Sequence, residues 1–278
     1  MPIGSYAHQL VRNPLKRALR RVFGTLDFHS HIRLRPMLDF VETFSALPTQ
    51  APICVLELGC GSGINLFELA ERFPNLAGHG YDLNAAAIAS ATQDAARLFP
   101  GRLRFRQADA CREIPDGEFD IVLLIDVLEH VPNPRDILRR VSLSVRPGGT
   151  VLVSVPTPRY PQVFGYQFHK SIGHLVDGYD LSMLNALIPK DLTLVQHRYT
   201  TGIFASAFCA LYYRVLPRVT NLTLASLLRL CTLPFTSFDF FNGRRHSCSL
   251  FAAYQKLHSS PASRGSCANS TAAEEVLT

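Results

Sequence analysis

The residues best suited to chemistry begin with three glycines at alternate positions, Gly59, Gly61 and Gly63, which follow the apolar run of residues 53–58. Glycine has no Cβ, so a chain that carries it here can turn tightly and bring its backbone close to a ligand. The spacing is G-x-G-x-G rather than the G-x-G-x-x-G of dinucleotide-binding proteins. A glycine loop alone is a weak indication, because a tight turn between a strand and a helix needs the same residues.

Acidic residues follow the next three apolar runs. Asp82 lies 19 residues beyond the last glycine, where a carboxylate can accept hydrogen bonds from both hydroxyls of a ribose. Asp109 follows the third run, where it could contact the amino group of an adenine, and Asp126 ends the fourth run. Each aspartate could instead cap a helix or hydrogen-bond its own loop, although Asn84 is available to cap the helix after Asp82.

An alternation of strands and helices must position these residues. The apolar patterns predict strands at residues 53–58, 77–83, 103–108, 119–125 and 150–155, with helices at 64–73, 85–99 and 134–145. Short strands that alternate with longer helices are typical of a doubly wound α/β sheet. Right-handed crossovers place the carboxyl ends of such strands at one edge, so we expect the loops after them to form one cleft.

The rest of the chain divides into an arm, insertions and a tail. After the fifth strand we expect an insertion at residues 159–180, a helix at 181–188, a strand at 192–199, an apolar stretch at 200–241 and a last strand at 248–256. The predicted organisation is an N-terminal basic amphipathic helical arm or cap at 1–50, a main domain at 51–258 with acceptor-binding insertions at 159–247, and a tail at 259–278. The tail is rich in Ser, Ala, Gly and Thr, which predicts disorder.

Four motifs in this order closely resemble those of the class I S-adenosylmethionine-dependent methyltransferases, within them the small-molecule group that includes ubiquinone-biosynthesis O-methyltransferases. The resemblance is firm over residues 52–158. It implies a Rossmann-like, seven-stranded sheet whose last strand is antiparallel. The motifs are Val55-Leu56-Glu57-Leu58-Gly59-Cys60-Gly61-Ser62-Gly63 with Asp82 after it, Gln107-Ala108-Asp109-Ala110, Asp126-Val127-Leu128-Glu129-His130-Val131, and Arg146-Pro147-Gly148-Gly149.

The resemblance implies that the cofactor is S-adenosyl-L-methionine (SAM), held by the glycine loop and by residues at the strand ends. The implied contacts are Gly59, Gly61 and Gly63 under the methionine part and ribose, Glu57 beneath that loop, Asp82 on the ribose, Leu83, Asp109 and Ala110 at the adenine, and Asp126 beside the methionine moiety or the reacting methyl group.

A sulfonium methyl group is already a strong electrophile, so such an enzyme chiefly aligns the acceptor and excludes water. An alcohol acceptor also needs a base with a pKa near neutrality. His130 follows the fourth strand at the cleft edge and is the candidate base, with Asp126 as a second candidate catalytic group. A structural His130 that pairs with its loop or with Glu129 is the alternative.

The insertion after the fifth strand is expected to cover the acceptor. His169, His174 and Tyr179 could line the acceptor pocket or belong to a solvated loop. A metal held by His169, His174 and Asp177 has no family spacing to support it, so we expect no metal. The apolar stretch at 200–241 would wall a pocket for a lipophilic acceptor, or would contact a partner or a membrane.

The expected reaction is methyl transfer to a small molecule, at oxygen rather than nitrogen or carbon. The loop after the fourth strand has no Asn-Pro-Pro-Tyr sequence, no Pro-Cys nucleophile and no paired-glutamate clamp, which disfavours nucleic acid and protein acceptors. Two alternatives keep the fold: aminopropyl transfer, which lacks an obvious acidic polyamine site, and a non-catalytic module that binds SAM or a partner.

The charge distribution also disfavours nucleic acid as a partner of the main domain. The 278 residues carry a net charge of +6, but residues 1–35 hold seven basic residues against one acidic residue, whereas residues 36–160 hold 11 against 15. Residues 10–26 form a basic amphipathic pattern that could lie on an anionic membrane or dock on the domain.

The seven scattered cysteines argue against a disulfide framework. With no signal peptide or spanning segment expected, we predict a cytoplasmic protein, peripheral to the inner membrane face if the arm binds there; the sequence leaves its oligomeric state open.

Overall fold

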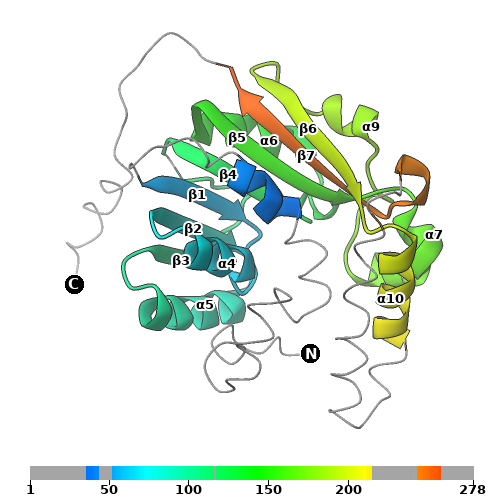
Figure 1. The fold of residues 1–278 in the computed structure, drawn as a ribbon, viewed down its shortest axis with the longest axis horizontal. Coiled ribbons are helices and arrows are strands. Elements are labelled where there is room, and N and C mark those ends of the chain that lie inside the picture. Colours follow the sequence, from blue (N-terminus) through cyan, green and yellow to red (C-terminus); the bar gives the residue numbers. More distant parts are fainter. Residues whose placement is uncertain (1–35, 44–51, 116, 215–238, 240–242, 258–278) are drawn as a thin grey trace.

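The computed structural model describes residues 36–43, 52–115, 117–214, 239 and 243–257. Its centre is a seven-stranded sheet with strand order β3-β2-β1-β4-β5-β7-β6 (Figure 1). β1 to β5 are parallel, and β7 runs antiparallel to both β5 and β6. The expected doubly wound sheet with an antiparallel last strand is therefore confirmed. The strands are β1 Ile53–Leu58, β2 Leu76–Asp82, β3 Leu103–Gln107, β4 Phe119–Ile125, β5 Val145–Pro156, β6 Leu192–Thr200 and β7 Ser249–Lys256.

The helices follow the expected alternation, with a few different ends. They are α4 Ile64–Arg72, α5 Ala85–Leu98, the short 3-10 helix η1 Leu128–His130, α6 Pro134–Ser144, α7 Tyr160–Phe164, α8 Tyr166–Ser171, α9 Leu181–Asn185, α10 Ile203–Arg214 and the 3-10 helix η4 Arg244–His246. β5 begins five residues earlier than expected, at Val145, because Val145 already pairs with Phe119 across an irregular start of the ladder. α9 ends three residues earlier than expected, at Asn185.

The sheet is covered on both faces. On one face, α4 and α5 pack with the helical residues 36–43 against β1, β4, β5 and β7, and Phe40 contacts Phe251. On the other face, η1, α6 and α9 pack against alternate residues of the same strands. Continuous apolar runs such as Phe119–Ile125 arise because a central parallel strand is buried on both sides.

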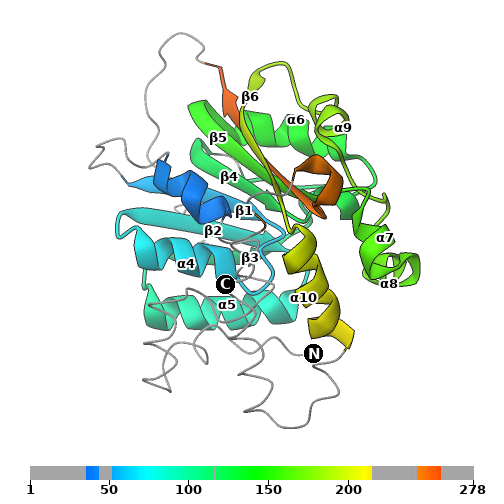
Figure 2. The same cartoon turned by 45° about the vertical axis from the view of Figure 1, so that its right-hand side comes forward.

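One edge of the sheet gathers the elements of interest. β1, β2, β4 and β5 end there, and β7 begins there, because Pro156 pairs with Ser249. Both views show α7, α10 and η4 beyond this edge (Figures 1 and 2). The insertions after β5 therefore cover the end of the sheet at which the predicted site residues lie.

Several expectations concern residues outside the described part of the chain, among them the amphipathic pattern at 10–26, most of the apolar stretch after residue 214 and the tail at 259–278. Within the described part, we find no helix both long enough and apolar enough to cross a bilayer. Cys54 is disulfide-bonded, which the scattered cysteines did not indicate, whereas Cys60, Cys111 and Cys248 are free thiols.

Candidate active site

The glycine loop joins β1 to α4 in a left-handed backbone. Gly61 has a φ of +53°, and a Cβ placed on it would meet no atom within 4 Å. At Gly59 and Gly63, in contrast, a Cβ would collide with Val127 and Phe105. The two outer glycines are therefore required by packing inside the protein, and the middle one faces open space where a ligand can approach the backbone.

Asp82 ties the end of β2 to this loop. Its Oδ2 accepts a hydrogen bond from the Gly61 backbone N–H at 2.7 Å, and its Oδ1 accepts one from the Asn84 N–H at 2.8 Å. Asn84 caps α5 with its own side chain, which accepts from the Ala87 N–H. Asp82 is thus not needed as a helix cap, and each carboxylate oxygen keeps a lone pair for a further donor.

Glu57 lies buried beneath the loop, with a side chain that is 1% exposed. Its Oε1 accepts a hydrogen bond from Asn65 Nδ2 at 2.6 Å, while its buried Oε2 has no hydrogen-bond partner within the described part of the chain. Burial raises the pKa of Glu57 to about 8, an effect that the Asn65 hydrogen bond opposes and the charge of Asp82 reinforces. A buried carboxylate with an unsatisfied oxygen is prepared for a cationic or hydrogen-bonding ligand.

The predicted adenine contacts lie at the neighbouring strand ends. Leu83 directly follows β2 and is 67% exposed, an unusual position for a large apolar side chain that a ring could cover. Asp109 follows β3, and its Oδ1 accepts from the Cys111 N–H while its Oδ2 pairs with Arg112. Ala110 is partly buried against the core. Asp109 therefore holds its own loop, and its contact with adenine stays a prediction.

Asp126 directly follows β4 and has a φ of +54°, in the left-handed region that non-glycine residues seldom occupy. Such strain often accompanies functional positions. The open side of Gly61, the unsatisfied Glu57 Oε2 and the exposed Leu83 lie on successive elements of one sheet edge, and they offer backbone approach, an acceptor for an amino group and an apolar surface. These residues fit SAM.

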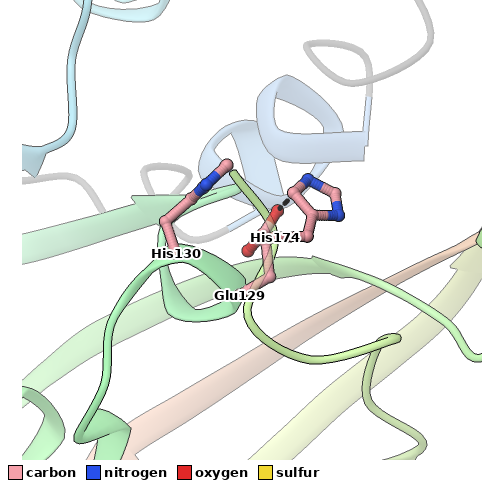
Figure 3. A group of neighbouring side chains, drawn as sticks. All are labelled: Glu129, His130 and His174. Atoms are coloured by element: carbon pink, nitrogen blue, oxygen red, sulfur yellow. Dashed lines mark ion pairs between the residues drawn. The ribbon is translucent and has the colours of Figure 1, made fainter. Parts of the chain in front are cut away.

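Beyond Asp126, three imidazoles and a carboxylate converge. Figure 3 shows Glu129 and His130, both on η1, with His174 of the facing loop. His174 Nε2 lies 3.9 Å from Glu129 Oε1, and the rings of His130 and His174 are 4.7 Å apart. His130 Nδ1 hydrogen-bonds the Gly173 carbonyl, so this nitrogen carries the proton and Nε2 holds the lone pair when the ring is neutral.

Buried hydrogen bonds hold the loop that carries His174 in place. His169 Nε2 bonds the Val176 carbonyl and its Nδ1 lies 2.9 Å from His174 Nδ1. The buried Tyr179 donates its hydroxyl to the Leu128 carbonyl. Through these contacts His169 and Tyr179 hold the loop against η1, and contact of either residue with an acceptor stays a prediction.

A cleft of about 460 Å³ opens at the ends of β5 and β6. Three arginines line it, Arg159, Arg244 and Arg245, together with Asp180. Arg244 pairs with Asp180 at 2.9 Å, and hydrogen bonds from Ser182 and Met183 lower the pKa of Asp180 and keep it ionised. The four side chains leave a formal charge of +2, which suits an anion. The cleft is also lined by Thr157, Pro158, Gln162 and Tyr199.

The structure adds residues that the sequence reasoning missed. Asn65 was hidden in the predicted helix, although an amide in the first turn after a glycine loop is a usable signal. Arg244 and Arg245 are adjacent basic residues before the last strand, but only the fold shows that they lie beside Arg159. Glu129 was considered from the sequence only as a possible partner of His130, and it lies in the convergent cluster with His130 and His174. The set of His169, His174 and Asp177 considered from the sequence is not the set that converges.

Comparison with known proteins agrees with this geometry. Residues 28–192 match the family described as "Methyltransferase domain". This match covers more than half of the chain. The chain therefore belongs to the class I SAM-dependent methyltransferases, a family whose cofactor is S-adenosyl-L-methionine.

The chain is similar to several particular proteins. Over an aligned segment of 124 residues, which is 45% of each chain, it is 33% identical to a trans-aconitate 2-methyltransferase of Methylobacterium nodulans. Over an aligned segment of 104 residues, it is 38% identical to a ubiquinone biosynthesis O-methyltransferase of Pseudomonas aeruginosa. This segment is 36% of this chain and 43% of that relative. The chain thus spans less than half the length of these curated relatives. Its fold resembles phosphoethanolamine N-methyltransferase 2 of Haemonchus contortus, solved with SAM, with a TM-score of 0.59, 17% identity, and coverage of 86% and 59% of the two chains.

Proposed function

We propose that this protein transfers the methyl group of SAM to an oxygen atom of a small acceptor that has an apolar part and an anionic group. The observation that carries the proposal is the link between Gly61 and Asp82, which sets the open glycine loop against a strand-end carboxylate. When bound, SAM supplies an electrophilic sulfonium methyl group, and its transfer to a hydroxyl leaves S-adenosylhomocysteine and releases the hydroxyl proton.

Different residues of the chain are proposed to bind different parts of SAM. Glu57 Oε2 would accept from the amino group of the methionine part, and Asp82 would accept from the ribose hydroxyls. Leu83, Asp109 and Ala110 would surround the adenine. Asp126 would lie beside the methionine part. Each contact uses an atom or surface that lies at the carboxyl edge of the sheet.

The acceptor is proposed from surfaces of the chain that follows β5. The segment from α8 to Val176 exposes large apolar side chains, which supports an apolar acceptor part. The arginine cleft supports an anionic group such as a carboxylate or phosphate, because arginine binds both in bidentate fashion. The exposed side chains are Tyr166, Ile172, Leu175 and Val176.

His130 is proposed to receive the acceptor's hydroxyl. Its Nδ1 donates a hydrogen bond to the Gly173 carbonyl, so Nε2 is the atom that can accept a hydrogen bond from the acceptor hydroxyl. The side chain is exposed, as a group that meets an incoming acceptor must be.

The test is incubation of cell extracts with SAM labelled in its methyl group, followed by mass spectrometry of small molecules. A labelled product formed by the wild type and lost with Asp82→Ala supports the proposal. Saturable SAM binding without any labelled product would favour the non-catalytic alternative. Absence of SAM binding would overturn both.

We also propose a cytoplasmic location in which residues 10–26 contact an anionic membrane surface. The proposal is supported by the sequence pattern alone, since these residues lie outside the described part of the chain. Sedimentation with anionic liposomes should fall when residues 1–26 are removed. Unchanged sedimentation would contradict the membrane contact.

A further inference from the structure

We propose that Glu129, His130 and His174 bind a divalent cation at the edge of the acceptor site. One ligand atom from each residue lies within 4.8 Å of the other two. Metal–nitrogen and metal–oxygen bonds of about 2.0–2.2 Å place the ligand atoms of a tetrahedral site roughly 3.5 Å apart. Binding one ion therefore requires side-chain rotations that shorten the widest separation by roughly 1 Å.

The hydrogen bonds around the cluster orient both imidazoles as ligands. His130 Nδ1 donates to the Gly173 carbonyl, which leaves Nε2 as an electron-pair donor. His169 Nε2 donates to the Val176 carbonyl, so in the neutral ring His169 Nδ1 accepts from His174 Nδ1. His174 Nε2 then also presents a lone pair. Partners that fix the tautomer through the second nitrogen are the usual surroundings of metal-bound histidines.

The position of the carboxylate completes the argument. Glu129 Oε1 faces His174 Nε2 at 3.9 Å, beyond hydrogen-bond distance (Figure 3). The two side chains are 1% and 6% exposed. A divalent cation would be bound by this carboxylate oxygen and by the lone pair of His174 Nε2, and His130 would reach the same ion from the exposed side.

The ligand set limits the kind of ion. Two imidazoles and one carboxylate suit Mn²⁺, Fe²⁺, Co²⁺ or Zn²⁺ better than Ca²⁺, which prefers oxygen ligands. Three protein ligands leave coordination positions open. The role of the ion rests on the proposed function: an ion on His130 Nε2 would replace the direct contact between that nitrogen and the acceptor hydroxyl, and would lower the pKa of a hydroxyl bound to the ion.

Two features of the chain anchor the cluster before any ion binds. The Leu175 N–H donates to the Glu129 carbonyl, which fixes the histidine loop against η1. The ring of Tyr160 packs 5.6 Å from that of His174. The ligands therefore come from two segments that the backbone already holds together.

The experiment uses the full chain without a histidine tag, stripped with a chelator and dialysed against Mn²⁺ or Co²⁺ alone. We expect one bound ion per chain by elemental analysis, and an absorption band of histidine-bound Co²⁺. His174→Asn and His130→Asn should each weaken binding at least tenfold. The control His197→Asn removes an exposed histidine on β6 and should leave binding unchanged.

Two outcomes overturn the proposal: a wild type that holds no more ion than the surrounding buffer, or ligand variants that bind the ion as tightly as His197→Asn does. Because Glu129 is buried, Glu129→Gln is used only with a check of the fold by circular dichroism. SAM binding is measured on the same samples by calorimetry. Loss of SAM binding with intact ion binding would contradict the proposed function and leave the cation site standing. Intact SAM binding without ion binding would contradict the cation site and leave the proposed function standing.

Discussion

The carboxylate of Asp82 accepts a hydrogen bond from the backbone of Gly61 at 2.7 Å, across 21 residues of chain. This contact joins the end of β2 to the loop after β1, so the ribose-binding carboxylate and the open backbone of the loop are positioned together. A change at either residue should therefore disturb SAM binding more than it disturbs folding.

We expect Asp82→Ala to weaken SAM binding by about 10- to 100-fold, because it removes charge-assisted hydrogen bonds worth about 1.5–3 kcal/mol each. Calorimetric titration measures the change. Asp191→Ala, an acidic residue that precedes β6, is the matched control and should bind SAM like the wild type. Equal affinity of the two variants would contradict the assignment of Asp82.

Gly61→Ala should separate backbone strain from obstruction of the ligand. Its Cβ would point into open space, but its φ of +53° disfavours alanine and should cost about 1 kcal/mol of stability. Gly101→Ala is a close control, since Gly101 has a φ of +75° and equally open surroundings in the turn between α5 and β3. Thermal unfolding should show similar losses for both variants. Only Gly61→Ala should lose SAM affinity, and a parallel loss in Gly101→Ala would mean that strain alone is responsible.

Glu57 should give SAM binding a proton signature. Because burial raises the pKa of Glu57 to about 8, this carboxyl is mostly protonated at pH 6.5 in the free protein. Binding of an ammonium group favours the ionised form, so SAM should displace close to one proton. Calorimetry in two buffers of different ionisation enthalpy measures it. Glu57→Gln should release none, and it should bind SAM more weakly.

The same pKa shift predicts how stability varies with pH. The folded protein holds the Glu57 proton up to about pH 8, whereas the unfolded chain loses it near 4.5. Between these values the folded state binds more protons, so the contribution of Glu57 to stability falls as pH rises, by up to about 1.4 kcal/mol per pH unit. Denaturant unfolding of Glu57→Gln should show a flatter pH dependence than the wild type over this window. Identical slopes would contradict the buried, protonated carboxyl.

The arginine cleft should bind a small polyanion. Citrate is a convenient probe, and Arg159→Gln or Arg245→Gln should each weaken its binding by about tenfold if each guanidinium donates to a carboxylate. Affinity should also fall with added salt, since these side chains are partly exposed. Arg104→Gln, an exposed arginine on β3, serves as the control. Citrate binding that is insensitive to both cleft variants would rule out an anion site.

The sequence by itself determined the parts that depend on local pattern. The alternation of apolar runs predicted the sheet, and the rule that parallel strands end at one edge brought Gly61, Asp82 and Asp126 together. Asn84 was recognised as an available helix cap because capping depends on the residue and its immediate neighbours.

Only the tertiary structure decided the contacts made by irregular segments. His174 reaches Glu129, and Arg245 reaches Arg159, because the chain after β5 follows a path that no periodicity encodes. The helical residues 36–43 likewise pack on the sheet through Met37, Phe40 and Val41, which their sequence did not reveal. Regular elements are fixed by repeating side-chain patterns, whereas loops are fixed by the surfaces on which they come to rest, and those surfaces exist only in the folded protein.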